Sequence, residues 1–464
     1  MASTTLPAAR GDSAGVLERV SDFVLHRGVE QFPSSVLETV SYLLLDTLGI
    51  AAAAAPMEAG QIGRDVAALL HASNADGFSA RMLFDGRRVS VAGAAYAAAT
   101  QTDNLDGHDG YSPTKGHIGV AVVPALAALA QARPDLTGPE ALAALVIGYE
   151  IAGRAGIALH ATVSDYHTSG AWNALGVAAL AARLRRLTPD QLRQALGIAE
   201  YHGPRSQMMR EIAHPTMLHD GSGWGAMVGI SAAVLAERGF TGAPAATVEA
   251  PEAARHWHDL GALWQVEHQY IKPYPICRWS HAAIDATRAL CRDNDLKPEQ
   301  ISRIHVNSFR YAAELFRGMP DTTSKAQYSL PFAVAVMAVH GRIGLEHISG
   351  AGLVDPAVAA MVKRITVTEA ERHSARFPAG RWADLRIWTT DDRVLHSGDV
   401  HAPGGPEAPF SRADIVGKYT EFTAPVFGNS RAAALQEGVL GLTAPGSRFA
   451  ELAPLLYEPL TARA

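Results

Sequence analysis

Apolar segments with helical spacing follow one another over more than half of this chain. From about residue 12 to residue 245, apolar residues recur at intervals that place them on one face of a helix, and Gly, Pro or Asp separates the segments. Several segments are apolar on all sides, so we expect them in the centre of a helical domain or at a subunit interface. The expected helices span residues 15–26, 34–54, 63–73, 91–102, 121–132, 138–160, 174–184, 188–201 and 225–239.

The pattern changes near residue 270, where Pro273 and Pro275 stop any helix. Beyond them we expect helices at 280–293 and 329–341. Alternating segments at 301–312, 362–371 and 381–400 are typical of strands, and the last of them fits a hairpin. A Pro/Gly-rich linker at 401–410 precedes a return to helices from about residue 411. The sequence therefore predicts a mainly α fold. A large helical domain would comprise residues 1–269 and 406–464, with a smaller α/β or α+β domain at 270–405.

The charge and the cysteines exclude several classes of protein. The net charge is −6 and no dense Lys/Arg run is present, which argues against a nucleic-acid partner. Cys277 and Cys291 are too few for a disulfide framework or a metal–thiolate cluster and favour a cytoplasmic protein. The N-terminal stretch lacks the apolar core of a signal peptide, and the most apolar segments are short or carry a charge such as Asp46. We expect neither secretion nor membrane insertion.

Four of the 19 histidines stand at breaks between apolar segments rather than inside them: His117, His167, His219 and His281. Each would lie at or near the start of a helix, where free N–H groups and a partial positive charge favour an anion. Because imidazole titrates near neutrality, four histidines in this setting predict a shared pocket that moves protons.

The densest polar segment, residues 102–117, lies between two strongly apolar helices. It holds Asp103, Asp106, His108, Asp109 and Lys115. Carboxylates and imidazoles in a buried or cleft-facing loop shift one another's pKa and transfer protons. A solvated loop of turn-forming residues explains the segment as well. Its DGHDG core lacks the alternate-position acids and the closing Glu of a calcium loop.

Cationic side chains near the four histidines would suit a substrate with several carboxylates, since Arg binds a carboxylate with two N–H groups. They are Lys115, Arg205, Arg210, Lys272 and Arg278. The histidines and aspartates also permit a metal site, although no HxH, HxxxH or HExxH spacing occurs. The glycines at 221, 223 and 225 allow backbone to approach either a substrate or another helix.

Motifs in a fixed order along nearly the whole chain resemble the MmgE/PrpD family, which includes 2-methylcitrate dehydratases, cis-aconitate decarboxylases and an iminodisuccinate epimerase. They include LLLDTLGIAAAA, DNLDGHDG, KGHIGVAVVPALAAL, GYEIAGR, YHTSGAWNALGVAALAARL, ALGIAEYHG, MLHDGSGWGAMVGISAAVLA, KPYPICRWSHAAIDA and SLPFAVAVM. The resemblance implies a helical domain closed by the two ends of the chain, an inserted lid domain, a homodimer, and no metal or organic cofactor.

The resemblance also implies which residues form the site. Asp103, His117, His167 and His281 match positions of the decarboxylase site. His219 stands where the family often has a lysine.

A second departure follows in SLPFAV, where Phe332 stands where the decarboxylases have a tyrosine and Tyr328 lies four residues earlier. Both departures argue against cis-aconitate decarboxylation as the specific reaction. The 102–117 loop is longer than in the decarboxylases, and its His108 and Lys115 are candidate replacements.

The reactions of the family share proton transfer at a carbon next to a carboxylate or imine. We expect His117 and His167 to act as acid and base, with Asp103 orienting an imidazole. His281 and Lys115 or Arg278 would hold the substrate carboxylates, and His219 and His281 also count among the expected catalytic residues. Further candidates for substrate binding are His108, Lys272, Arg210 and Tyr328. The predicted function is that of a cofactor-independent lyase acting on a small polycarboxylic acid. Dehydration is the favoured reaction. An epimerase or decarboxylase, a non-catalytic binding protein and, last, a metal hydrolase are the alternatives.

Overall fold

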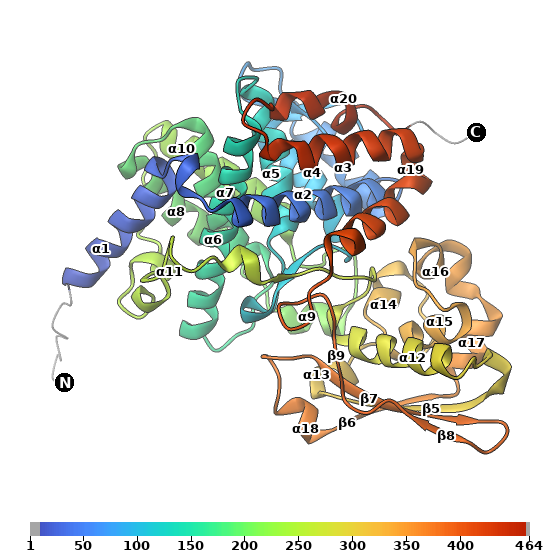
Figure 1. Cartoon of the computed structure of the whole chain (residues 1–464). Helices are drawn as coiled ribbons and strands as arrows, with labels where there is room; N and C mark the ends of the chain where they lie inside the picture. The colour runs from blue at the N-terminus through green and yellow to red at the C-terminus, as the bar shows by residue number, and fades with distance from the viewer. Residues whose placement is uncertain (1–9, 461–464) are drawn as a thin grey trace, which may run out of the picture.

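Helices make up 60% of the structure, a computed structural model that describes residues 10–460 (Figure 1). The N-terminal helices are α1 (Arg10–Ser21), α2 (Ser34–Ala54), α3 (Glu58–Leu70), α4 (Val91–Asp103), α5 (Gly119–Leu129), α6 (Gly138–Thr162), α7 (Gly170–Arg185), α8 (Pro189–His202), α9 (Met208–Ala213), α10 (Ser222–Glu237) and α11 (Ala246–Glu249). Those that follow are α12 (His281–Asp293), α13 (Arg310–Ala313), α14 (Thr323–Gln327), α15 (Leu330–His340), α16 (Leu345–Ile348), α17 (Pro356–Val362), α18 (Glu371–Ser374), α19 (Arg412–Leu440) and α20 (Ala453–Leu456). The mainly α fold predicted from the sequence is confirmed.

Local sequence explains where the long helices begin. At α6, the Thr137 side chain accepts a hydrogen bond from the N–H of Glu140, and the Glu140 carboxylate accepts one from the N–H of Thr137. The same reciprocal capping occurs at α8, between Thr188 and Gln191. Such pairs satisfy N–H groups that the first turn of a helix leaves free.

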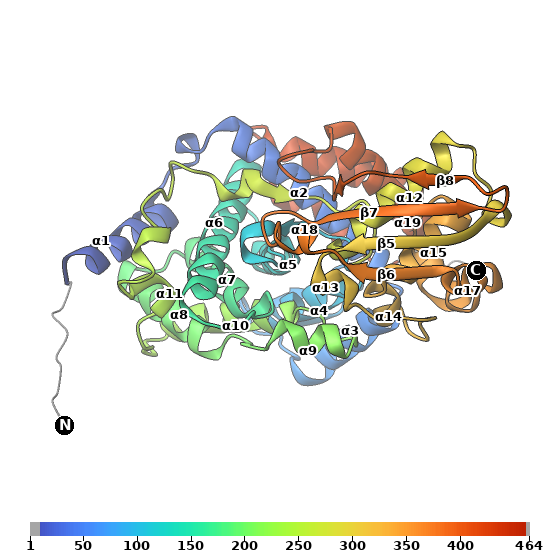
Figure 2. The same ribbon diagram turned by 90° about the horizontal axis from the view of Figure 1, so that it is seen from below.

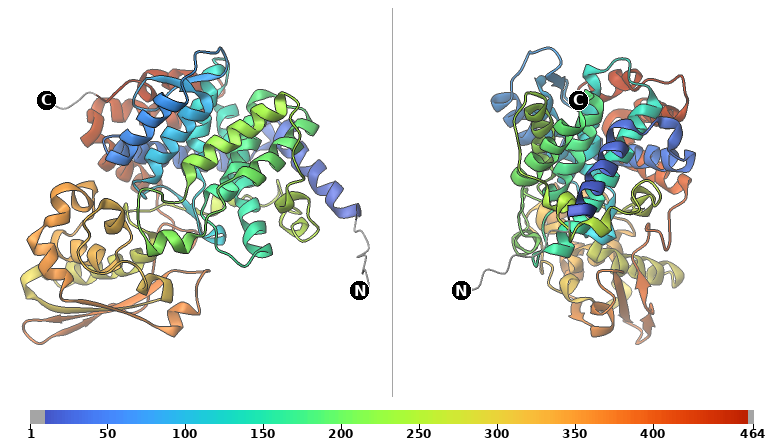
Figure 3. Two further views of the ribbon diagram at one scale, coloured as in Figure 1. Left: turned by 180° about the vertical axis from the view of Figure 1, so that it is seen from behind. Right: turned by 90° about the vertical axis from the view of Figure 1, so that its left-hand side faces the viewer.

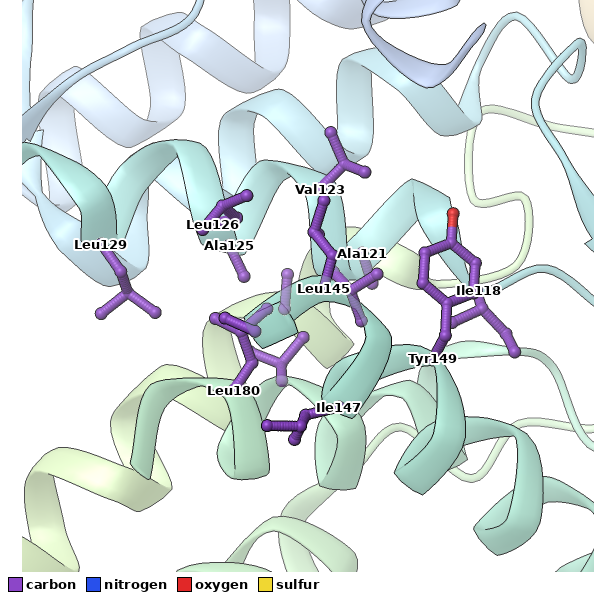
Figure 4. Packing of buried hydrophobic residues seen from close by; sticks show 14 of the residues in the cluster. Ile118, Ala121, Val123, Ala125, Leu126, Leu129, Leu145, Ile147, Tyr149 and Leu180 are labelled. Carbon is purple, nitrogen blue, oxygen red and sulfur yellow. The ribbon is translucent and has the colours of Figure 1, made fainter. Parts of the chain in front are cut away.

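Helix α7 packs between α6 and α10 at the centre of the helical part, and small residues bring these helices close together. A Cβ atom at Gly176 would lie 2.5 Å from the carbonyl oxygen of Gly148, and one at Gly225 would lie 2.7 Å from that of Gly170. Close helix packing therefore explains Gly225. Figure 4 shows apolar side chains of α5, α6 and α7 filling the space between these helices.

The described residues form two large hydrophobic cores and a small third one between α7, α8 and α10. The first includes N-terminal residues from Val16 to Ile271 and C-terminal ones from Ile415 to Tyr457. Helix α19 lies beside α2 in this core, so the two ends of the chain pack together (Figure 1). The second core is built mainly from residues 274–402 and joins a few side chains of the helical part. The segment around residue 272 thus passes from one core to the other.

A five-stranded mixed sheet lies under helices α12 and α15 (Figures 1 and 2). Its strands are β5 (Ile301–Ser308), β6 (Ile365–Glu369), β7 (Trp382–Thr389), β8 (Val394–His396) and β9 (Val400–His401). Strand β5 pairs in parallel with β6 and antiparallel with β7, and β7 also pairs with β8 and β9.

The expected strands and the hairpin of β7 and β8 are present. The strand expected over 301–312 ends at Ser308, and the last residues of that segment belong to helix α13.

Four short strands were not predicted, three of them in the region expected to be helical. They are β1 (Ser79–Arg81) with β2 (Arg88–Ser90), and β3 (Gly110–Tyr111) with β4 (Gln269–Tyr270). They are too short to give a period along the sequence, and the partners of the second pair lie far apart in the chain.

Helices α2 and α6 are both long and apolar enough to cross a membrane by length and composition. Their apolar windows are 78% and 94% buried inside the protein, as in core helices of a soluble protein.

Candidate active site

The four histidines singled out in the sequence all stand at helix starts. His117 precedes α5, His167 precedes α7, His219 precedes α10, and His281 is the first residue of α12. The prediction of their local setting is confirmed.

His117 is held by the main chain of the 102–117 loop. Its Nδ1 atom donates a hydrogen bond of 2.7 Å to the carbonyl oxygen of Asp109, so in the neutral ring the lone pair resides on Nε2. That Nε2 atom lies 3.7 Å from Oδ2 of Asp220. Burial, helped by the charge of Lys272, lowers the pKa of His117 well below its ordinary value. Because its side chain remains 12% exposed, whereas His108 is fully buried, His117 is a neutral base that a ligand can reach.

Asp220 connects the α7 and α10 helix starts. Its Oδ1 atom accepts a hydrogen bond of 3.1 Å from the N–H of Ser169, which also accepts one of 3.0 Å from the N–H of His117 through its hydroxyl. Burial raises the pKa of Asp220 to about 6. The sequence marked Asp220 only as the neighbour of His219, because its contact with His117 joins segments about a hundred residues apart.

Asp103 and His108 form a second carboxyl–imidazole contact. The distance from Oδ1 of Asp103 to Nε2 of His108 is 3.7 Å, and Oδ2 of Asp103 accepts a hydrogen bond of 3.1 Å from the N–H of Ser222. The His108 and His117 rings meet edge to face, with centroids 4.7 Å apart. Burial and the charge of Asp220 raise the pKa of Asp103 well above its ordinary value. The imidazole that Asp103 approaches is thus that of His108.

Two lysines are buried against carboxylates beside this loop. Lys272 forms an ion pair with Asp106, and Lys418 donates hydrogen bonds of 2.6 Å to Asp46 and 2.7 Å to the carbonyl oxygen of Gly107. The first pair joins residues on opposite sides of the junction between the two cores. Lys418 comes from α19, and nothing in the sequence pattern marked it.

His219 lies beside Tyr328, which contacts a carboxyl group that the sequence did not predict. The rings of His219 and Tyr328 lie 5.8 Å apart, and the Tyr328 hydroxyl donates a hydrogen bond to Oε1 of Glu211. Burial lowers the pKa of His219 to about 3. Glu211 lies on the short helix α9 and is buried. No periodicity or motif distinguishes it in the sequence.

Three cations gather on the other side of His117. The Arg278 guanidinium lies 3.9 Å from the ring centroid of Tyr270, and the ammonium of Lys115 lies 4.4 Å from that of Tyr166. The charge of Arg381 adds to burial in lowering the pKa of Lys115, and that of Arg278 to about 10. Arg381 therefore lies within electrostatic range of both Lys115 and Arg278. Arg381 was not predicted, since it lies in the loop before β7, remote in sequence from the other two.

The His281 ring is fully buried and donates a hydrogen bond of 2.9 Å from Nε2 to the carbonyl oxygen of Ile276. Its Nδ1 atom makes no hydrogen bond within the described residues. Burial and the charges of Arg278 and Lys272 lower its pKa well below the ordinary value. His281 therefore stands between the two groups of cations.

The other predicted residues lie outside this cluster. The His167 ring stacks on the His160 ring, with centroids 6.5 Å apart, and the main-chain N–H of His167 donates a hydrogen bond of 3.2 Å to Nε2 of His160. Arg205 and Arg210 are exposed on the surface, and Phe332 is packed in the second hydrophobic core.

A cleft of 760 Å³ opens beside the site, between the helical part and α14 and α16. Asn104 and Met217 lie in its wall, next to Asp103 and close to His219 in the chain, and the Asn104 side chain donates a hydrogen bond of 3.1 Å to the carbonyl oxygen of Met217. Lys325 lies on its opposite wall. Figure 3 shows the two parts of the chain between which it runs.

Within residues 10–460, the one set of three side chains with atoms close enough to share a metal ion lies elsewhere, at His373, Asp384 and Asp399. Arg372 and Arg376 already form ion pairs with these two carboxylates. The histidines and aspartates of the site are arranged instead as separate imidazole–carboxyl contacts, which suit proton transfer.

Comparisons with known proteins agree with this arrangement. The MmgE/PrpD N-terminal domain matches residues 18–266, and the MmgE/PrpD C-terminal domain matches residues 274–443. The chain is 24% identical to a cis-aconitate decarboxylase of Aspergillus terreus, over 96% of this chain and 95% of that protein. It is 22% identical to a cis-aconitate decarboxylase-like protein of Aspergillus oryzae, over 92% and 94%. The chain belongs to the MmgE/PrpD family, whose members are enzymes and include lyases.

Proposed function

We propose that this protein is a lyase that removes a proton from a carbon next to a carboxylate of a small polycarboxylic acid, with loss of water. The observation that carries the proposal is the neutral His117 ring, fixed by the carbonyl of Asp109, with Nε2 directed toward Asp220. The cations Lys115, Arg278 and Arg381 lie beside it.

His117 would act as the base. When its Nε2 takes the α-proton, the C–H bonding electrons pass to the substrate as an enolate, and the ring becomes an imidazolium. The negative charge of Asp220, whose Oδ2 atom lies 3.7 Å from Nε2, stabilises that imidazolium. The hydrogen bond to Asp109 prevents the ring from presenting its other nitrogen.

The site carries less negative charge than its number of carboxyl groups indicates, and this favours the binding of a polyanion. Burial raises the pKa of Asp109 to about 7 and those of Asp103 and Glu211 well above their ordinary values. These shifts favour the neutral, protonated forms of the three carboxyls, whereas Lys272 forms an ion pair with Asp106. A substrate carboxylate would bind Arg278 and Arg381, and the enolate would be stabilised by the nearby cations.

Loss of hydroxide from the neighbouring carbon then completes a dehydration, and the departing hydroxide takes a proton to leave as water. Decarboxylation is the second candidate, because the relatives named above are a cis-aconitate decarboxylase and a cis-aconitate decarboxylase-like protein. The phenyl ring at Phe332 offers no hydroxyl at the position where the decarboxylases have a tyrosine, which favours dehydration. The proposal includes no cofactor, as the family resemblance implies.

We also propose a cytoplasmic homodimer. Helices α3, α4 and α10 form one face, seen from behind in Figure 3 and along the lower edge of Figure 2. It exposes large apolar side chains, including 47% of Ile62, 54% of Trp224 and 78% of Leu218. A second copy of the chain would bury these side chains. The two free thiols fit a reducing compartment.

Proton NMR in D2O tests the proposed reaction. The purified protein is incubated with 2-methylcitrate, citrate, cis- and trans-aconitate, citramalate and iminodisuccinate, and α-proton exchange and products are followed. We expect exchange and loss of water from one hydroxy acid. Release of CO2 would favour the decarboxylase, and inversion without a leaving group would favour an epimerase. No exchange with any of these acids would contradict the proposal and favour a binding protein.

A further inference from the structure

Glu211 is a buried carboxyl group that the steps above leave without a role. Its Oε1 atom accepts the hydrogen bond of Tyr328, while its Oε2 atom is buried and makes no hydrogen bond within the described residues. Met208 and Ile212 on the same helix are fixed in the second hydrophobic core, which includes Tyr328. The main chain of α9 is anchored by a hydrogen bond of 2.8 Å from the N–H of Met208 to the carbonyl oxygen of Tyr166.

The groups around Glu211 are mainly acidic. It faces the acids Asp220, Asp103 and Asp106, the Tyr328 hydroxyl and the Cys277 thiol. The lysine nearest to these groups, Lys272, is in an ion pair with Asp106. Burial and the charge of Asp220 raise the pKa of Glu211 well above its ordinary value. A protonated carboxyl can give a proton away, which an ionised one cannot.

Tyr328 offers a hydroxyl that Phe332 lacks. Its ring lies 5.8 Å from that of His219, whose Nε2 atom makes no hydrogen bond within residues 10–460, so one side of the Tyr328 ring borders the site. Its hydroxyl is hydrogen-bonded to Glu211 in the structure. When Glu211 is protonated, its O–H can donate across the same contact to the phenol oxygen, and the phenol O–H is then free to turn toward a substrate. A phenol alone is a weak acid, and burial raises the pKa of Tyr328 well above its ordinary value. A second acidic group hydrogen-bonded to Tyr328 would replace the proton that the phenol gives up, and Tyr328 would then be an effective donor.

Resting on the proposed function, we propose that Glu211 is a positioning residue that acts through Tyr328 as the proton source for the leaving hydroxyl group. As the substrate C–O bond breaks, the Tyr328 O–H proton passes to the departing oxygen and forms water. The proton of the Glu211 carboxyl passes to the Tyr328 oxygen and restores the phenol, leaving Glu211 ionised. His117 holds the α-proton, so the enzyme has gained one proton and lost one. Transfer from His117 to Glu211 through solvent restores the starting state.

The first test needs no substrate. Infrared difference spectra of the wild-type protein minus Glu211→Gln, recorded at pH 7, should show the C=O band of a protonated carboxylic acid, which shifts in D2O. A carboxylate band in its place would overturn the proposal.

The second test separates the donor step from proton abstraction. Glu211→Gln keeps the shape of the side chain but has no acidic proton, so water loss should fall about 10²-fold or more in Glu211→Gln and Tyr328→Phe. Exchange of the α-proton in D2O should change by less than about threefold in both, since His117 is intact. Wild-type elimination should also decline at high pH, and Glu211→Gln should lack that decline. Glu252→Gln, at an exposed position, is the matched control.

The outcomes distinguish this proposal from the proposed function. Equal loss of exchange and elimination in Glu211→Gln, with an unchanged melting temperature, would show a general structural role and overturn the donor role. Elimination equal to that of the wild type would overturn it as well. If the wild-type protein acts on none of the acids, the proposed function fails and the donor role fails with it, while the infrared band still reports whether Glu211 is protonated.

Discussion

The Nδ1 atom of His117 lies 2.7 Å from the main-chain carbonyl oxygen of Asp109, and this contact fixes which nitrogen of the ring faces the site. A main-chain acceptor cannot be removed by a side-chain change and does not titrate. The tautomer of His117 is therefore independent of pH, whereas its other neighbour, Asp220, titrates.

We predict that Asp220 sets the acid limb of the pH profile. Its pKa is raised to about 6, so protonation below pH 6 removes the charge that stabilises the His117 imidazolium. The rate should fall as the pH drops through about 6. Asp220→Asn should lower kcat by about 10²-fold or more and remove that limb. Asp76→Asn, in an exposed loop, is the control. An unchanged acid limb in Asp220→Asn would contradict the assignment.

The Asp106–Lys272 pair should show strong coupling in unfolding experiments. Both side chains are buried, so Asp106→Leu or Lys272→Met alone leaves an unpaired buried charge and should cost about 3–5 kcal/mol of unfolding free energy. The double variant should lose much less than the sum, as measured by urea unfolding. The exposed pair Asp295–Lys297 should show no measurable coupling. Additive losses at Asp106 and Lys272 would contradict a buried pair.

Asp109 should make the protein less stable as the pH rises. Burial raises its pKa to about 7 in the folded protein, from an ordinary value of 3.8, so the folded state binds the proton more tightly. This stabilisation is complete below about pH 4, declines between pH 4 and 7, and is absent above pH 7. The melting temperature of Asp109→Asn should therefore decline less than that of the wild type over this range. Parallel curves would contradict the raised pKa.

Arg381 should bind a substrate carboxylate. Arg381→Met should raise KM about 10- to 100-fold, because a charge-assisted hydrogen bond is lost. The effect should be smaller for an analogue with one carboxylate fewer, measured in steady-state kinetics. Arg303, an exposed residue over the Trp388 ring, gives the control variant Arg303→Met. A fall in kcat with unchanged KM would show that Arg381 does not bind the ground-state acid.

The exposed face of α3 and α10 should hold two copies of the chain together. Trp224→Glu places a charge where 54% of an indole is exposed and should convert a dimer to a monomer in light scattering. Val354→Glu, at an apolar side chain exposed elsewhere, should leave the dimer intact. A wild-type monomer would contradict the proposed assembly.

The sequence predicted local features of the site but not its long-range contacts. His117 and His281 were found because helix starts are visible in periodicity and in prolines, and these are properties of neighbouring residues. The contact of Lys272 with Asp106 spans 166 residues, and that of Tyr328 with Glu211 spans 117.

Such contacts depend on how the two cores meet, and no spacing along the chain encodes that. For the same reason Arg381 was missed, and His160, the neighbour of His167, was not predicted. The strands of the main sheet were predictable from alternation, whereas β3 and β4 exist only because residues 110 and 270 meet.

Deuterium exchange at the substrate α-carbon by His117→Gln tests the central claim most directly. Gln can retain a hydrogen bond but cannot accept the proton, so we expect exchange in D2O to fall at least about 10²-fold, with the wild-type melting temperature. His160→Gln, which removes an imidazole outside the cluster, should leave the exchange rate within about threefold of the wild type. Exchange by His117→Gln at the wild-type rate would contradict His117 as the base, and with it the proposed mechanism.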